Sequence, residues 1–91
     1  MNIERYVIVA EQFNGCKVFA GYEDSSSGLP VWYEEENEHK AQEFLTVETA
    51  KSWYNGAKKY LDEYYTENCY PHSATIQKRV IQYKYVEVEA I

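Results

Sequence analysis

The alternation of apolar and polar residues changes along the chain, and each change predicts a different element. Residues 4–12 and 17–23 are rich in β-branched and aromatic side chains that alternate, as in strands. Asn14 and Gly15 stand between them, and this dipeptide accepts the positive φ angles of a tight hairpin turn. We therefore expect a β-hairpin. Its first strand would have two apolar faces, one with Tyr6, Ile8 and Ala10 and the other with Val7 and Val9.

The segment after the hairpin predicts a loop, a short extended piece and a short helix. Residues 24–30 are polar and end in Pro30, which cannot donate to a sheet. Residues 31–34 then form either a third strand or an extended arm. From Glu36 onward the apolar residues follow a spacing of i, i+3 and i+4, which favours a helix of roughly two to three turns. These residues are Ala41, Phe44 and Leu45.

A longer helix is predicted over residues 46–66. Thr46 is a suitable N-cap, Pro71 lies beyond the predicted end, and Gly56 is either closely packed or a tolerated weak point. The apolar positions keep a period of 3.6 residues and include Val47, Ala50, Trp53, Ala57, Leu61 and Tyr64. We expect this face to pack on the sheet at Val7, Val9, Val18 and Ile81.

The last segment, residues 74–90, has strand character throughout. Its alternation slips near Tyr85, which predicts either a bulge there or a long strand that bends across the sheet. The expected fold is therefore α+β, with an antiparallel sheet of three or four strands and one long and one short helix packed on one face. With 91 residues, the chain forms a single domain over residues 1–91.

Composition restricts the classes of partner. The formal net charge is -6, so the chain repels nucleic-acid backbones and direct binding to DNA or RNA is not expected. No apolar run reaches the ~20 residues of a membrane span, and the N-terminal residues have no secretory pattern. We therefore expect a cytoplasmic protein with no membrane partner, in which Cys16 and Cys69 are thiols.

No motif for catalysis, a cofactor or a metal stands out. Cys69 and His72 form one local pair, whereas a zinc site takes four ligands, usually as two close pairs. Cys69 also follows the predicted end of a helix, where the helix dipole opposes a thiolate. The glycines are scattered and form no phosphate-binding loop. The sequence therefore predicts a protein that is not an enzyme and binds no cofactor or metal.

Two groups of residues are candidates for binding. The first is an acidic run beside two aromatic residues, which suits binding to a basic partner. A structural explanation is also open: the glutamates would be the solvated start of a helix, and Trp32 would pack in the core. This first group consists of Trp32, Tyr33, Glu34, Glu35, Glu36 and Glu38. The second group, suited to stacking a base and holding a phosphate, is an alternative ligand site. It consists of Lys78, Arg79, Tyr83, Lys84 and Tyr85.

The chain resembles small proteins carried by phages and prophages of Gram-positive bacteria. The likeness covers about two thirds of the chain: the hairpin YVIVAEQFNGCKVFAGY, Trp32, the segment AQEFLTVETA and the closing strand of valines and glutamates. Members with a known role tend to bind and block a host machine, and they include anti-CRISPR and other anti-defence inhibitors. Many are acidic and some imitate nucleic acid. The resemblance implies a class of role and assigns no residue.

Three functions follow as expectations. The first is a non-enzymatic interaction protein of phage type, an acidic inhibitor of a defence nuclease or another nucleic-acid-binding host protein. The second is a protein that binds or sequesters a nucleotide-like small ligand. The third is a structural or assembly role through the sheet, for which a homodimer is the simplest form.

Overall fold

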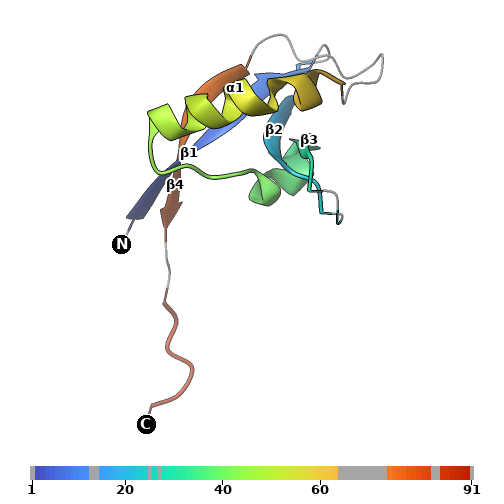
Figure 1. Ribbon diagram of the computed structural model, residues 1–91. Coiled ribbons are helices and arrows are strands. Elements are labelled where there is room, and N and C mark those ends of the chain that lie inside the picture. The colour runs from blue at the N-terminus through green and yellow to red at the C-terminus, as the bar shows by residue number, and fades with distance from the viewer. Residues whose placement is uncertain are drawn as a thin grey trace.

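The fold is a four-stranded antiparallel sheet with one long α-helix and one short 3-10 helix (Figure 1). The computed structural model describes residues 2–12, 15–24, 26, 28–63, 74–82 and 85–90. In chain order the elements are β1 (Asn2–Glu11), β2 (Lys17–Tyr22), β3 (Pro30–Glu34), the 3-10 helix η1 (Glu35–Lys40), α1 (Val47–Glu63) and β4 (Ala74–Gln82). The strand order is β3-β2-β1-β4. The predicted α+β class is confirmed, and residues 31–34 belong to a third strand.

The predicted hairpin is confirmed, with a short pairing between its strands. Val9 pairs with Phe19 and Glu11 with Lys17, so only the second half of β1 lies beside β2. Gly15 has φ 86°, the left-handed conformation that glycine adopts without strain, while Asn14 lies outside the described residues. On its other side β1 pairs with β4 along its length, from Asn2 opposite Gln82 to Ala10 opposite Ala74. The first half of β1 therefore has an edge that β2 does not cover.

Residues 41–44 fill that gap as an extended segment between β1 and β2. Ala41 forms a bridge with Gly21, and Gln42 N–H donates to Ala20 O at 2.9 Å. Phe44 exchanges two backbone hydrogen bonds with Tyr6, both 2.8 Å long. The predicted short helix is present as η1, but it ends at Lys40, so the prediction that it runs through Ala41, Phe44 and Leu45 is wrong.

The reason is that helices and extended segments differ in the period with which their side chains return to the same face. In an extended segment, two residues three positions apart point to opposite faces. Accordingly, Ala41 joins one buried cluster and Phe44 joins the other. A spacing of three thus buries both residues without a helix, and Leu45, the third residue of the predicted pattern, is 70% exposed.

Two apolar clusters lie on the two faces of the sheet. The cluster under α1 consists of Ile8, Ala10, Val18, Ala20, Trp32, Phe44, Ala50, Ala57 and Leu61. The other face holds Val7, Val9, Phe19 and Ala41. The prediction that α1 packs on Val7 and Val9 is wrong: alternation along β1 turns them away from the face with Ile8 and Ala10. Ile81 pairs with Ile3, in the same alternation as Val7. Tyr64 lies outside the described residues.

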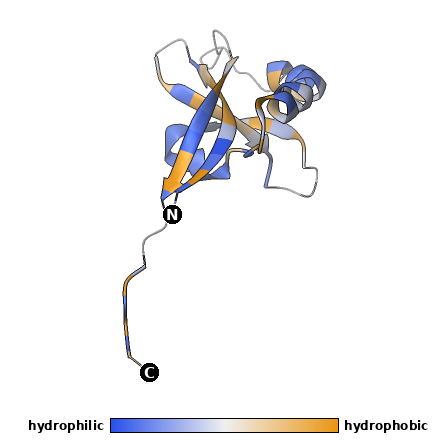
Figure 2. Cartoon of the chain, turned by 90° about the vertical axis from the view of Figure 1, so that its left-hand side faces the viewer, coloured by the Kyte–Doolittle hydropathy of each residue, from blue (hydrophilic) through white to orange (hydrophobic). Residues whose placement is uncertain are grey.

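The two helices lie on opposite sides of the sheet, as Figure 2 shows, rather than on one face as predicted. Helix α1 is held to the sheet by Trp53, whose indole N–H donates to Tyr22 Oη at 2.6 Å and whose ring lies 5.5 Å from that of Phe44. The predicted N-cap is confirmed, because Thr49 N–H donates to Thr46 Oγ1 at 3.1 Å. Helix α1 thus covers one face of the sheet, and η1 lies on the opposite face, beside Val7, Val9 and Phe19.

Strand β4 ends at Gln82, before the predicted limit of residue 90. Residues 85–90, which we call the arm, lie outside the sheet and are exposed, so neither the bulge near Tyr85 nor the bent strand is present in the described residues. The arm follows the strand pattern, but no neighbouring strand of this chain pairs with it in the part that the structure describes. No helix among the described residues is long and apolar enough to cross a membrane.

Candidate functional site: a polar hollow rimmed by glutamates

The acidic run lies where β3 passes into η1. Glu34 is the last residue of β3, and Glu35, Glu36 and Glu38 follow in the 3-10 helix; all four are exposed. Carboxylates at the start of a helical turn are favoured because its N–H groups have no intrahelical acceptor. The turn is short because Asn37 leaves helical geometry (φ -113°, ψ 23°). The glutamates are thus concentrated on a compact turn at the end of a strand.

This turn borders a polar hollow on the face of the sheet opposite α1. The hollow has a volume of about 620 Å³. It is lined by Val7, Val9, Lys17, Phe19, Glu35, Glu36, Glu38, Gln77, Lys78 and Arg79. The structure therefore brings part of the predicted acidic group together with Lys78 and Arg79, which the sequence assigned to a separate ligand site.

A smaller hollow continues this surface around the end of the sheet. Its volume is about 380 Å³, and it is lined by Gln12, Cys16, Lys17, Glu34, Glu35 and Glu36. Three residues, Lys17, Glu35 and Glu36, line both hollows. Together the two hollows expose all four glutamates of the acidic run to one continuous region.

Several charges around the larger hollow are already used within the chain. Arg79 Nη2 donates to the backbone oxygen of Glu38 at 2.7 Å, and its Nη1 lies 3.4 Å from Glu43 Oε2. Arg79 therefore connects β4 to the end of η1. Lys78 Nζ lies 3.5 Å from Glu4 Oε2. Both cations therefore already have a carboxylate partner within the chain.

The remaining charges make the region acidic. Glu35 Oε1 accepts a hydrogen bond from Lys17 N–H at 3.1 Å, so this carboxylate also has a structural role. Among the described residues, the carboxylates of Glu34, Glu36 and Glu38 make no ion pair. Of the lysines that line the two hollows, only Lys17 likewise makes no ion pair with a described residue. Three carboxylates thus face one unpaired cation. We call Glu34, Glu36 and Glu38 the acidic rim.

The two aromatic residues of the predicted site have structural positions. Trp32 is 6% exposed and belongs to the cluster under α1, which is the core-packing role that the sequence also allowed. Tyr33 is half-buried and its hydroxyl donates to Tyr22 O. The Lys40 ammonium lies 5.7 Å from the Tyr33 ring centre. Trp32 therefore cannot present its ring to a partner without leaving the core.

Lys40 fixes the C-terminal end of η1 to the loop after β2. Its Nζ donates to Asp24 Oδ2 at 2.6 Å. This hydrogen bond, together with the charge of Asp24, raises the pKa of Lys40 above its ordinary value of 10.5. The contact is at the surface, so it orients the turn more than it stabilises the fold.

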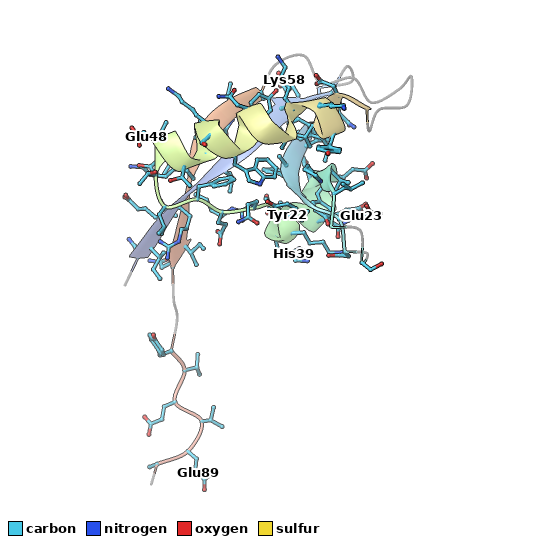
Figure 3. The ribbon with its side chains drawn as sticks, viewed as in Figure 1. Tyr22, Glu23, His39, Glu48, Lys58 and Glu89 are labelled. Carbon is cyan, nitrogen blue, oxygen red and sulfur yellow. The ribbon has the colours of Figure 1, made fainter. Side chains whose placement is uncertain are left out.

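The alternative ligand group is divided by the structure. Tyr85 is 87% exposed on the arm, which runs away from the sheet (Figure 3), and Arg79 is held by Glu38 and Glu43. Tyr83 and Lys84 lie outside the described residues. Among the described members, only Lys78 and Arg79 are brought together.

A third hollow is more apolar and lies between α1 and β4. Its volume is about 410 Å³, and its lining consists of Ile8, Val47, Lys51, Tyr54, Asn55, Ala74, Thr75 and Ile76. Burial, and after it the charge of Asp62, raise the pKa of Tyr54 above its ordinary value of 10.0. This hollow is not evident from the sequence, whose pattern placed the helix over Val7 and Val9 instead of Ile8.

Sequence reasoning also missed Lys17 at the larger hollow. Lys17 is the first residue of β2 and pairs with Glu11 across the hairpin, so the register set by the turn was the signal that could have placed it at this end of the sheet. Gln77 and Arg79 come near η1 only through the pairing of β4 with β1, which local patterns do not contain.

Known proteins provide no family for this chain: no protein-family model matches it, and neither the curated proteins nor the solved structures contain a significant match. Within the described residues, no three His, Cys, Asp or Glu side chains are grouped as ligands for a metal ion. Cys69 and His72 lie outside those residues. Function is therefore inferred from the geometry of the surface.

Proposed function

We propose that this chain is a non-enzymatic binding protein whose acidic rim docks against a basic surface of a partner protein. The observation that carries the proposal is the surplus of unpaired carboxylates on a compact turn. Glu34, Glu36 and Glu38 are exposed, while the nearby cations Lys78 and Arg79 are already engaged by other groups of the chain. A surplus of one sign of charge attracts a partner of the opposite sign and accelerates its association.

The shape of the region supports a side chain as the docking group. An arginine or lysine of the partner fits a hollow of about 620 Å³ that is open to solvent and bordered by carboxylates. Glu35 and Arg79 hold the rim in place by their bonds to Lys17 N–H and Glu38 O. A rim fixed in advance loses less conformational entropy when it binds.

The partner that fits this chemistry best is a protein with a basic groove, such as a nucleic-acid-binding enzyme. A groove that holds phosphates presents arginines and lysines at the surface. The resemblance to phage and prophage proteins agrees with an inhibitor of a host defence nuclease, acting in the bacterial cytoplasm. An inhibitor of this kind blocks the groove instead of binding DNA itself, in keeping with a net charge of -6.

A pull-down from bacterial lysate at low and at high salt tests the proposal. The tagged parent chain is compared with the variant Glu34→Lys/Glu36→Lys/Glu38→Lys, which spares Glu35 because its carboxylate holds Lys17 N–H. We expect the parent to capture a basic protein at low salt, to lose it at high salt, and to compete with duplex DNA for it. The rim variant should not capture it.

A matched variant separates the rim from overall charge. Glu11→Lys/Glu48→Lys/Asp62→Lys also reverses three exposed carboxylates, so both variants change the formal net charge from -6 to 0. Capture by the matched variant together with loss in the rim variant supports the proposal. Equal capture by the parent and the rim variant overturns it.

A small-ligand function is the second candidate, and it is favoured by the apolar hollow between α1 and β4. Its volume of about 410 Å³ lies in the range of small-molecule sites, and Lys51 and Tyr54 supply polar groups beside an apolar lining. A thermal-shift screen with nucleotides tests this candidate, since a ligand that binds the native state raises Tm. Loss of the shift in Tyr54→Ala would assign it to this hollow.

A further inference from the structure

The arm exposes apolar side chains that a folded chain normally covers. Tyr85, Val86 and Val88 are 87%, 82% and 94% exposed, whereas Glu87 and Glu89 alternate with the valines. Figure 2 shows the arm leading away from the sheet, and Figure 3 places Glu89 far from every other labelled side chain. Alternation of valine and glutamate is the pattern of a strand with one covered face. The arm is therefore a strand without a sheet.

The same chain offers a sheet edge without a strand. β4 pairs with β1 over its whole length, and no described segment pairs with its outer edge. Val80 on this strand is 55% exposed. A strand of nine residues is a long open edge, and such edges readily accept an additional strand.

The arm is poorly suited to cover the edge of its own β4. Folding back as a hairpin requires a tight turn at residues 83–84, and the favoured two-residue turns need positive φ, hence Gly, Asn or Asp. The sequence there is Tyr83-Lys84, which contains none of these residues. An edge supplied by another molecule has no such requirement.

We infer that two copies of this chain exchange arms, each arm adding as an antiparallel strand to the outer edge of β4 in the other copy. One register brings apolar side chains together on both faces: Val86 faces Val80 and Tyr85 faces Ile81 of the other copy. Directly opposed residues in antiparallel strands lie on the same face, so this register pairs apolar with apolar side chains at these two positions.

The exchange is reciprocal and closes on itself. Each copy gives one arm and receives one, so a two-fold axis satisfies both edges and leaves no free β4 edge for a third copy. The acidic rim lies at the end of β3 and on η1, and although Arg79 of β4 donates to Glu38 O, no residue of the rim belongs to β4 or to the arm. The dimer and the proposed docking function therefore rest on different residues.

Disulfide trapping between two different variants tests the register. Val80→Cys and Val86→Cys are prepared separately, each with Cys16→Ser and Cys69→Ser, and are then mixed under mild oxidation. Because neither variant alone contains both positions, a disulfide between positions 80 and 86 can form only between copies. We expect the mixture to give this disulfide as its main cross-linked product, identified by mass spectrometry.

The control for trapping replaces Val80→Cys with Leu29→Cys, which is also an exposed apolar position but precedes β3 at the opposite edge. We expect at least a tenfold lower yield of cross-linked dimer from this mixture, since the arm does not reach that edge. Equal yields from the two mixtures overturn the inference.

Sedimentation analysis tests whether backbone pairing of the arm holds the dimer. Glu87→Pro/Val88→Pro removes two adjacent N–H groups, which point to opposite sides of a strand, so one of them must face the partner in any register. Glu87→Gln/Val88→Thr is the control that keeps both N–H groups. We expect twice the monomer mass for the parent and the control, and the monomer mass for the proline variant. A monomeric parent, or a proline variant that remains dimeric, overturns the inference.

Discussion

At the scale of single residues, the two glycines Gly21 and Gly56 occupy opposite environments. A Cβ built at Gly56 in α1 meets no atom within 4 Å, so no packing requires glycine there. Alanine in a helix interior is favoured over glycine by roughly 1 kcal/mol. Gly56→Ala should therefore raise the free energy of unfolding by up to about 1 kcal/mol, measured by urea denaturation. A decrease would contradict the open space around this position.

Gly21 should respond in the opposite direction. A Cβ at this position lies 2.7 Å from the backbone oxygen of Lys40 and 3.0 Å from Tyr33 Cε2. The close approach arises because residues 41–44 pair with β2 at this point. We expect Gly21→Ala to lower the free energy of unfolding by about 1–3 kcal/mol, as in other overpacked sites. An unchanged midpoint in the same urea experiment would contradict this close approach.

At the scale of elements, the start of α1 depends on one hydroxyl. Thr46 Oγ1 accepts the hydrogen bond from Thr49 N–H, an amide that has no intrahelical acceptor. Thr46→Ala should lower the free energy of unfolding by about 1 kcal/mol, whereas Thr46→Asp keeps an acceptor and should retain most of the stability. Thermal unfolding followed by circular dichroism measures both. Equal losses in the two variants would mean that the hydroxyl is not the cap.

Local signals predicted the cap, the hairpin and the helix because each depends on neighbouring residues. The segment 41–44 was predicted wrongly because a spacing of three suits a helix face and equally suits an extended segment that buries residues on two faces. What decided between them was the short pairing of β1 with β2, which leaves room beside Tyr6. That gap is a property of the sheet and is not contained in residues 41–44.

The candidate site likewise has a part that was predicted from the sequence and a part that depends on the fold. Glu34, Glu36 and Glu38 were found from the sequence because they are consecutive or nearly so. The engagement of Arg79 by Glu38 O and Glu43 was not, because it requires β4 to lie beside β1. Charge runs are thus visible in a sequence, whereas the pairing that decides which charges remain available is a product of the fold.

At the scale of the whole molecule, stability should fall at alkaline pH. Burial raises the pKa of Tyr54 above 10.0, and the hydrogen bond to Asp24 raises the pKa of Lys40 above 10.5. In both cases the folded state holds its proton after the unfolded state has lost it, so stability is complete at lower pH and declines above about pH 10. Tyr54→Phe should make the decline of Tm with pH shallower. Parallel curves for the parent and Tyr54→Phe would contradict this.

Arm exchange makes stability depend on protein concentration. A second copy binds the folded chain and not the unfolded one, so mass action stabilises each chain by up to about 0.7 kcal/mol for each tenfold rise in concentration, half of the roughly 1.4 kcal/mol gained by the dimer. For a domain of this size, 1 kcal/mol corresponds to roughly 4–8 °C in Tm. We therefore expect the Tm of the parent chain to rise when its concentration is increased by roughly a hundredfold.

The variants designed for the arm identify the origin of this dependence. Because the arm lies outside the sheet, Glu87→Pro/Val88→Pro should leave the Tm at low concentration unchanged and remove its rise at high concentration. Glu87→Gln/Val88→Thr should keep most of the rise. If the Tm of the proline variant still rises with concentration, the copies contact each other through another surface, which would contradict arm exchange.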